Sequence, residues 1–341
     1  MAGVETRCVA HDEDGMRLDR WFRTHYPVLR HGKLEQLLRK GQIRVDGGRA
    51  KAAFRLAEGQ SIRVPPMPDV PAQAATSDAP AIDPKIAARD ARAIDEMILH
   101  EDETLLVLNK PHGLAVQGGS GTARHVDGMV HLWAAHRTTT TGTQEPSPRL
   151  VHRLDRDTAG VLILAKTRAA ATRLGQAFQN QTVEKTYWAL TAGVPHPRFG
   201  TIKRPIAKRM VRTPDDTLLE KMVPAEGEEA KRAISDFQVV GEAGADIGFV
   251  ALRPRTGRTH QLRVHCAVIG TPIIGDGKYG LGQSRIEGLS GKLHLHCRSM
   301  RFRHPRTGAW VQFSAPLSGH MRAAWQFFDF DDAAEPIWPD Q

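Results

Sequence analysis

Cysteine and long apolar runs are both scarce in this chain of 341 residues. Its 3 cysteines, Cys8, Cys266 and Cys297, are odd in number and widely scattered, which argues against a disulfide framework and favours reduced thiols. No apolar run approaches the ~20 residues of a membrane span, and the N-terminal stretch MAGVETRCVAHDEDG lacks the apolar core of a signal peptide. The sequence therefore predicts a cytoplasmic protein without disulfide bonds.

Acidic residues are in deficit, with 38 Asp and Glu against 47 Lys and Arg and a net charge of +9. The excess is concentrated in residues 15–64, where twelve Lys and Arg stand against four acidic residues, a net charge of +8. Such a cluster indicates a polyanion as partner. The remaining composition, 40% hydrophobic and 25% charged, is that of a globular protein and excludes a fibrous or wholly disordered chain.

The basic segment has its own pattern of helices and strands. Leu18, Trp21 and Phe22 recur at helical spacing, and the apolar residues of GKLEQLLRKG do the same before Gly41 ends that helix. QIRVDGGRA and SIRV alternate apolar and polar residues around turn-forming glycines, as short strands do. We therefore predict a small helix–helix–strand–strand domain over residues 15–64.

The rest of the chain is predicted to be a linker followed by one larger domain. Residues 65–93 are rich in proline, which removes backbone donors and favours extended chain. Within residues 94–330, strands such as TLLVLNKP, VLILAK and TYWALTAG are separated by helical stretches such as TRAAATRLGQAFQ, which predicts an α+β domain. The threonine-rich stretch HRTTTTGTQEPSP, residues 136–148, is predicted to be a loop.

The stretch VHRLDRDTAG places Asp155 between Arg153 and Arg156, just before the apolar run VLILAK. Thr158 and Gly160 suit a tight turn, so Asp155 is expected on a loop at a strand end, where catalytic groups are commonly placed. A plain surface ion pair is the commoner outcome for an aspartate between arginines. A neighbouring guanidinium also keeps a carboxylate ionised, however, and an ionised carboxylate can attack carbon or remove a proton.

The basic segment RLDRW…GKLEQLLRKGQIRVDGGRAK…LAEGQSIRV resembles the S4 RNA-binding domain. The resemblance implies that two basic helices contact structured RNA through its phosphates, which gives salt-dependent affinity without sequence choice. A solvated helix face is the alternative reading of these charges. The phosphate contacts that the resemblance implies are Lys33, Arg39, Lys40 and Arg44.

Five ordered motifs resemble the RluA/RluC/RluD family of pseudouridine synthases. They are LHEDETLLVLNKPHGLAVQGGSG, HRLDRDTAG, KTYWAL, RTGRTHQLRVHCAVIGTPIIGDGKYG and LHLHCRSMRFRHP. The resemblance implies a mixed, largely antiparallel sheet and the conversion of uridine to pseudouridine in RNA, with neither cofactor nor metal. GGSG and the S4-like segment resemble the RluC-like branch, which modifies large-subunit (23S) ribosomal RNA. RNA is thus the expected partner of a monomer, with no membrane and no obligatory protein partner.

The same resemblance implies roles for individual residues. Asp155 is the essential carboxylate, which either adds to the ribose C1′ or abstracts the 2′ proton. Arg263 pairs with Asp155 and holds it ionised. Tyr187 stacks on the uracil and helps remove the C5 proton after the base is reattached, whereas an aromatic residue that only packs a strand is the alternative reading. Because a base inside a stem must be flipped out, substrate-binding side chains are also expected. These are Arg153, which occupies the vacated space, Leu295, which lines the base pocket, and Arg258.

Two other functions remain open from the residues alone. A non-catalytic RNA-binding or ribosome-assembly factor would need only the basic domain. A metal-dependent hydrolase could use histidines on one face of a strand, although neither a CxxC motif nor an acidic cluster accompanies them. The candidate ligands are His260, His265, Cys266, His294, His296 and Cys297.

Overall fold

The computed structural model describes residues 4–10, 13–26, 29, 31–66, 84–119, 122, 124–212, 216–280 and 286–338. The chain divides into two compact units, Met1–Ile82 and Asp83–Gln341, and each encloses its own hydrophobic core. Within the described ranges, no helix has the length and apolar character needed to cross a bilayer.

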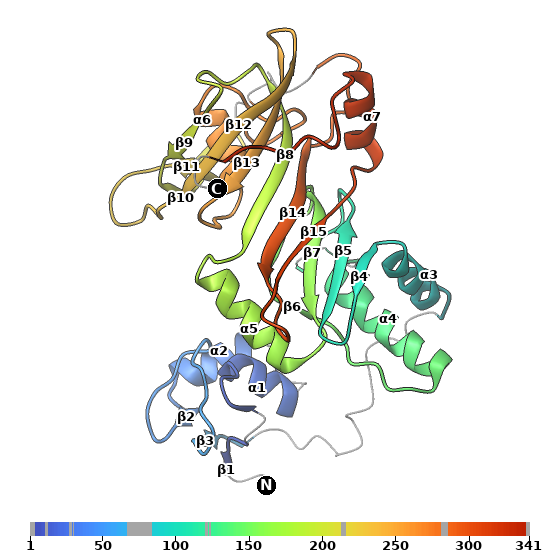
Figure 1. The fold of residues 1–341 in the computed structure, drawn as a ribbon. Helices are drawn as coiled ribbons and strands as arrows, with labels where there is room; N and C mark the ends of the chain where they lie inside the picture. Colours follow the sequence, from blue (N-terminus) through green and yellow to red (C-terminus); the bar gives the residue numbers. More distant parts are fainter. Residues whose placement is uncertain are drawn as a thin grey trace. The chain divides into compact units, whose positions relative to one another are not determined.

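The N-terminal unit contains both predicted helices and both predicted strands (Figure 1). Its three strands form one antiparallel sheet in the order β1-β3-β2. Apolar side chains at helical spacing, such as Leu18 and Leu37, share one core with Ile62 of the sheet. The elements are β1 (Glu5–Cys8), α1 (Leu18–His25), α2 (His31–Arg39), β2 (Arg44–Val45) and β3 (Ser61–Val64).

The predicted start of this unit at residue 15 is wrong, because β1 belongs to it. Glu5 pairs with Val64 along the outer edge of β3. The segment before α1 is also tied down, since Glu13 accepts hydrogen bonds from the Trp21 indole at 2.9 Å and from a backbone N–H at 3.0 Å. The four residues of β1, ETRC, are polar and mostly exposed, so no apolar alternation marks them in the sequence.

The predicted linker, residues 65–93, is wrong at its C-terminal end. Residues 67–83 lie outside the described residues, whereas Pro84–Asp95 form helix α3. Proline is compatible with a first helical turn, where its missing N–H would have no partner. Asp90 of this helix is buried and pairs with Arg124 at 2.9 Å, so α3 is part of the C-terminal unit.

The C-terminal unit is built on a 10-stranded sheet with the order β4-β5-β7-β14-β8-β13-β12-β9, in which β15 also pairs with β14 and β6 with β7. Its pairs are antiparallel except β7 and β14, which run parallel. This confirms the α+β class with a mixed, largely antiparallel sheet. The strands are β4 (Ile98–Glu101), β5 (Leu105–Lys110), β6 (Arg149–Leu150), β7 (Ala159–Ala165), β8 (Glu184–Ala192), β9 (Phe199–Lys203), β12 (Ile234–Ala243), β13 (Ile247–Pro254), β14 (Leu295–Arg303) and β15 (Trp310–Ser314).

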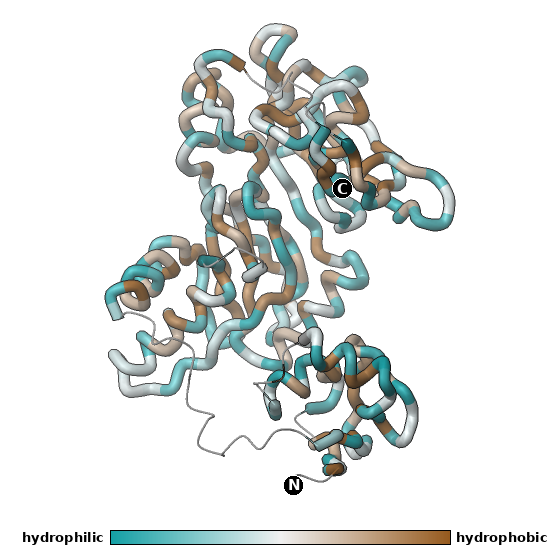
Figure 2. The backbone as a smooth tube through the Cα atoms, turned by 180° about the vertical axis from the view of Figure 1, so that it is seen from behind, coloured by the Kyte–Doolittle hydropathy of each residue, from teal (hydrophilic) through white to brown (hydrophobic). Residues whose placement is uncertain are grey.

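Apolar residues concentrate along the central strands of this sheet (Figure 2). Helices α3 and α4 pack together beside the β4–β5 end of the sheet. A separate antiparallel hairpin, β10–β11, extends from the other end. The remaining elements are α4 (Val126–Thr141), α5 (Arg168–Gln179), α6 (Gln261–Val268), α7 (Gly319–Phe327), β10 (Ile206–Arg212) and β11 (Leu218–Pro224).

The predicted loop at residues 136–148 is wrong in its first half, because α4 continues to Thr141. The hydroxyls of residues 138–141 each donate to the carbonyl four residues earlier, at 2.8 to 3.0 Å. Threonine is a weak helix former, yet this bonding satisfies its hydroxyl within the helix. The helix ends at Gly142, whose φ of 71° is left-handed.

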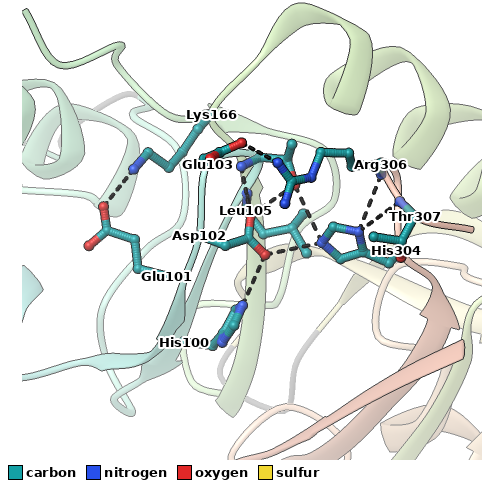
Figure 3. A network of polar contacts seen from close by, with 10 residues as sticks. His100, Glu101, Asp102, Glu103, Leu105, Lys166, His304, Arg306 and Thr307 are labelled. Carbon is teal, nitrogen blue, oxygen red and sulfur yellow. Dashed lines mark hydrogen bonds and ion pairs between the residues drawn. The ribbon is translucent and has the colours of Figure 1, made fainter. Parts of the chain in front are cut away.

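A polar network fastens the turn between β4 and β5 to the segment after β14 (Figure 3). The Asp102 carboxylate accepts hydrogen bonds from the backbone N–H groups of Thr104 and Leu105, at 2.6 and 2.9 Å. It also forms hydrogen bonds with Nε2 of His100 and Nε2 of His304, at 3.0 Å each. Burial alone would raise the pKa of Asp102, but these donors outweigh it and lower the pKa. The carboxylate therefore stays ionised and holds the edge of the sheet.

Strand β7 is a continuous apolar run, AGVLILA, buried along its whole length between β5 and β14. Gly160 allows the close approach to β14. Its φ is 108°, and a Cβ atom there would lie 2.1 Å from the carbonyl oxygen of Cys297. Only glycine fits, and the parallel pairing that results places the loop before β7 beside Leu295 at the start of β14.

Candidate active site

Asp155 lies, as predicted, on the loop between β6 and β7. Its backbone carbonyl accepts the Thr158 N–H at 3.1 Å, which closes the turn, while Leu154 is buried in the core beneath. The carboxylate itself is 30% exposed. A rigid strand thus presents a solvent-accessible carboxylate at a fixed position.

His152 ties the Asp155 loop to β7 and α5. Its Nε2 accepts the backbone N–H of Ile163 in β7 at 2.9 Å, and its ring stacks on Phe178 of α5 with centroids 4.4 Å apart. Burial lowers the pKa of His152 to about 3, so the imidazole is neutral and can accept that hydrogen bond. The residue has a structural role beneath Asp155.

Lys110, at the end of β5, also holds the Asp155 loop in place, through the Arg156 carbonyl. The side chain is fully buried, and Nζ donates to three backbone carbonyl oxygens, those of Pro111, Leu114 and Arg156, at 2.9, 2.8 and 3.0 Å. The Gly113 N–H donates to the same Arg156 carbonyl at 2.9 Å. The turn that begins with Asn109-Lys110-Pro111 therefore fixes the backbone of Arg156, the residue after Asp155.

We expect Lys110→Met to destabilise the fold by about 2–4 kcal/mol, because methionine fills the space but removes the donor to the Pro111 and Leu114 carbonyls. Urea unfolding of the full chain measures this loss. Lys208→Met is the matched control, since Lys208 forms an exposed pair with Glu220 and should change stability by less than ~1 kcal/mol. Equal midpoints for the two variants would contradict the anchoring role.

Two hollows meet at Asp155, with volumes of about 590 and 750 Å³. Asp155, His260 and Arg263 lie on the wall between them. The larger hollow is basic, with Lys278 and Lys292 on its rim. Every predicted catalytic and substrate-binding residue lines the smaller hollow, namely Arg153, Asp155, Tyr187, Arg258, Arg263 and Leu295.

Tyr187 and Leu295 reach the smaller hollow from neighbouring strands. Tyr187 of β8 stands opposite Cys297 of β14, and Leu295 lies two residues before that cysteine, on the same face of β14. Burial raises the pKa of Tyr187 well above its ordinary value, so the phenol keeps its proton at neutral pH. An aromatic ring and an apolar side chain thus form a surface on which a flat base can stack.

The predicted pairing of Arg263 with Asp155 is wrong in this structure, because Arg263 pairs with Asp276. Its Nε and Nη2 donate to the two carboxylate oxygens at 2.8 and 2.7 Å. The Asp276 carboxylate is fully buried and also accepts two backbone N–H groups, at 2.9 and 3.0 Å. This bidentate geometry satisfies Arg263 and Asp276 better than a pair between Arg263 and the partly exposed Asp155 carboxylate would.

The charge of Arg263 still acts on Asp155. Burial disfavours the guanidinium, but the ion pair with Asp276 and the nearby Asp155 carboxylate outweigh burial and raise the pKa of Arg263. A permanent cation therefore lies beside both carboxylates on the wall between the hollows.

Three residues of this site were not assigned from the sequence. Asp276 belongs to the motif GDGKYG, and His260 was considered only as a metal ligand. Lys185 precedes Tyr187 by two residues on β8, so it lies on the same face and lines the same hollow. The two-residue alternation of side chains along a strand, counted back from Tyr187, was the signal that could have identified Lys185.

The basic residues predicted to bind phosphates lie in the N-terminal unit, where their side chains are exposed. Arg44 also donates to the backbone carbonyls of Gly41 and Gly47, at 3.2 and 3.0 Å, which holds its guanidinium at the surface. The others are Lys33, Arg39 and Lys40, at the two ends of α2.

The structure gives no support to the metal-hydrolase alternative. Across the described part of the chain, no three His, Cys, Asp or Glu side chains come together as a metal site. His296 Nε2 instead contacts the backbone carbonyl of Ala315 at 3.1 Å, and His265 lies 2.9 Å from the Ser235 hydroxyl. Backbone and hydroxyl partners of this kind are typical of structural histidines.

Comparisons with known proteins agree with this geometry. Residues 104–268 match the family described as RNA pseudouridylate synthase. The chain is 34% identical over 331 residues to ribosomal large subunit pseudouridine synthase C of Salmonella typhimurium (strain LT2), which covers 95% of this chain and 96% of that protein. The protein of the same name from Escherichia coli (strain K12) is 33% identical over 331 residues, with the same coverage.

A solved structure shares the fold of most of the chain. Human RNA pseudouridylate synthase domain containing 4 matches with a TM-score of 0.59 and 27% identity, covering 72% of this chain and 97% of that chain. Sequence and fold thus lead to the same assignment. The chain belongs to the RluA/RluC/RluD family of RNA pseudouridine synthases, in its RluC-like branch.

Proposed function

We propose that this enzyme isomerises specific uridines of large-subunit (23S) ribosomal RNA, with Asp155 as its catalytic carboxylate and without a cofactor. The observation that carries the proposal is the position of Asp155 between two hollows, beside Tyr187, Leu295 and a permanent cation. The relatives that cover nearly the whole chain are named for the ribosomal large subunit, which supports the choice of substrate.

The reaction breaks the C1′–N1 bond and forms a C1′–C5 bond. N1 ends with a proton and C5 loses one, so no oxidant, reductant or water is consumed. The Asp155 carboxylate can serve in either of two ways, by adding to C1′ or by removing the 2′ proton to give a glycal. Both routes need an accessible, ionised carboxylate next to the ribose, and the loop before β7 provides that position.

The smaller hollow is suited to a flipped uracil. Its volume of about 590 Å³ accommodates a nucleoside, with Tyr187 and Leu295 stacking on the base. Arg153 lies at the junction of the hollows, where it can occupy the space that the base leaves in the RNA. The raised pKa of Tyr187 favours the neutral phenol, which supports a role in stacking on and orienting the base over removal of the C5 proton as a phenolate.

The decisive test is release of tritium from 5-tritiated uridine in a transcript of large-subunit ribosomal RNA. Formation of the C1′–C5 bond displaces the label, so tritium should appear in water, and mapping should find pseudouridine at a small number of positions. A small-subunit transcript is the control. Release from that control at an equal rate would contradict the proposed substrate, and no release from either RNA would contradict the activity.

We further propose that the N-terminal unit is an S4-like RNA-binding domain. Its support is the net charge of +8 in residues 15–64 together with the exposed basic side chains of α2. Such a unit would raise the concentration of RNA at the active site without taking part in bond making. RNA is then the partner of a monomeric enzyme that works in the cytoplasm.

A chain shortened to begin at Pro84 tests this division of labour, because it keeps α3 and therefore the core of the C-terminal unit. We expect weaker RNA binding and a shallower slope of log affinity against log salt, by ~0.9 for each phosphate that the shortened chain no longer neutralises. The single-turnover rate at saturating RNA should stay close to that of the full chain. An unchanged slope would mean that the N-terminal unit does not touch RNA.

A further inference from the structure

His260 is held in an unusual backbone conformation beside Asp155. It precedes the first turn of α6 with a φ of 53°, in the left-handed region that few residues other than glycine occupy. Strain of this kind persists where the surrounding structure imposes it, and it is often found at functional sites. Here it directs the imidazole onto the wall between the two hollows, with its Nε2 3.9 Å from Asp155 Oδ2.

Tyr279 fixes the other side of the ring. Its hydroxyl oxygen lies 2.7 Å from His260 Nδ1 and accepts the backbone N–H of Met222 at 3.1 Å. If the hydroxyl donates its one hydrogen to Nδ1, the ring proton is on Nε2 and faces the Asp155 carboxylate. This arrangement gives the Met222 N–H, the Tyr279 hydroxyl and His260 Nδ1 hydrogen-bond partners, and leaves the Nε2 hydrogen available to Asp155.

Burial keeps the His260 imidazole neutral at neutral pH. Burial lowers its pKa, and the cations Arg263 and Lys278 act in the same direction, against the opposing influence of Asp155 and Asp276. A neutral imidazole still donates one N–H. Nε and Nη2 of Arg263 are already committed to Asp276, whereas among the described residues His260 Nε2 is the basic side-chain nitrogen within 4 Å of the Asp155 carboxylate.

We propose that His260, oriented by Tyr279, is the positioning residue for the catalytic carboxylate. The inference rests on the proposed role of Asp155. A hydrogen on Nε2 would face Oδ2, and a hydrogen bond forms when the present separation of 3.9 Å shortens to about 3 Å. It restricts that carboxylate to the orientation that faces the ribose, while Arg263 supplies charge from a fixed position.

Two amide substitutions separate positioning from a purely structural role. Asparagine places its amide nitrogen near the position of Nδ1, so His260→Asn keeps a contact with Tyr279 and no longer reaches Asp155. Glutamine reaches the position of Nε2, so His260→Gln keeps a donor toward Asp155. Asparagine tolerates a left-handed backbone better than glutamine, so a structural role predicts the higher activity for His260→Asn.

We expect the opposite order. His260→Asn should lower the single-turnover rate at saturating RNA by roughly a hundredfold, as expected when a reacting group is misplaced, with RNA affinity and melting temperature close to wild type. His260→Gln should recover a substantial part of that rate, even if it is less stable. Equal rates for the two variants, or a faster His260→Asn, would overturn the proposal.

Tyr279→Phe provides a second test that does not alter the strained residue. Phenylalanine keeps the ring that packs under the Arg263 guanidinium, 5.1 Å away, and removes only the hydroxyl. We expect a several-fold slower single-turnover rate with unchanged RNA affinity. Wild-type rates for both Tyr279→Phe and His260→Asn, alongside an inactive Asp155→Asn, would remove this inference and leave the proposed function intact.

Discussion

Replacing Asp155 with asparagine should abolish pseudouridine formation while RNA binding stays almost unchanged. The amide preserves the size of the side chain but neither attacks carbon nor accepts a proton, so we expect a loss of about a thousandfold or more. We expect affinity for RNA to come mainly from contacts of basic side chains with phosphates, which this substitution leaves in place. Tritium release under single-turnover conditions, together with a binding titration, measures both quantities.

Asp216→Asn is the control for this substitution. Asp216 is an exposed carboxylate, paired with Arg212, in the turn between β10 and β11, and its φ of 64° suits asparagine. The same chemical change there should leave turnover at the wild-type level. Turnover by Asp155→Asn above the background of a no-enzyme reaction would show that another group performs the chemistry.

The second large effect is expected at Arg263. Arg263→Ala leaves the fully buried Asp276 carboxylate without its bidentate partner, and breaking a buried pair from one side costs about 3–5 kcal/mol. The cation beside Asp155 is removed as well, so activity should fall with stability. Arg263→Lys should retain part of both, since lysine restores the charge without the fork.

Chemical unfolding followed by circular dichroism measures the stability loss. Arg198→Ala is the control, because Arg198 forms an exposed pair with Glu242 and its removal should cost less than ~1 kcal/mol. A loss for Arg263→Ala no larger than that of the control would show that the buried pair contributes little.

The pH dependence of this loss has a defined sign. In the wild type, burial would raise the pKa of Asp276, but Arg263 and two backbone N–H groups outweigh it, so the folded-state pKa lies below the ordinary value. The resulting stability is present above the unfolded pKa and disappears as pH falls through the folded pKa. In Arg263→Ala, burial should instead raise the pKa of Asp276. The difference in stability between the two proteins should therefore begin to shrink above about pH 4, as pH falls through the raised pKa of Asp276 in the variant, and shrink further below about pH 4, where the wild type loses its own contribution.

Local patterns in the sequence determined much of this protein. Helical spacing of apolar residues was enough for α1 and α2, because each buries one apolar face. The apolar run after HRLDRDTAG gave the position of Asp155 at a strand end, since a strand buried on both faces must emerge into a loop. Tyr187 and Leu295 also line the predicted hollow, because the family motifs mark strand positions with a known period.

The partners of buried charges were decided only by the tertiary structure. Arg263 had two carboxylates within reach, Asp155 and Asp276, and sequence spacing does not distinguish them. Asp276 prevails because the turn at Gly275, with a φ of 75°, buries it and supplies two backbone donors. Gly275 also lies so close to the Lys292 carbonyl that a Cβ atom would be 1.9 Å from it, a contact that depends on segments distant in the chain.

The same reason explains β1, α3 and His260. A four-residue polar strand is stable only because β3 offers it an edge, and a helix that starts at Pro84 is stable only because α4 covers it. His260 faces Asp155 because Tyr279 and a left-handed backbone turn it there. The sequence by itself predicted which residues line the candidate site. Long-range packing decided which of them touch, because hydrogen bonds and ion pairs depend on distances that no local pattern encodes.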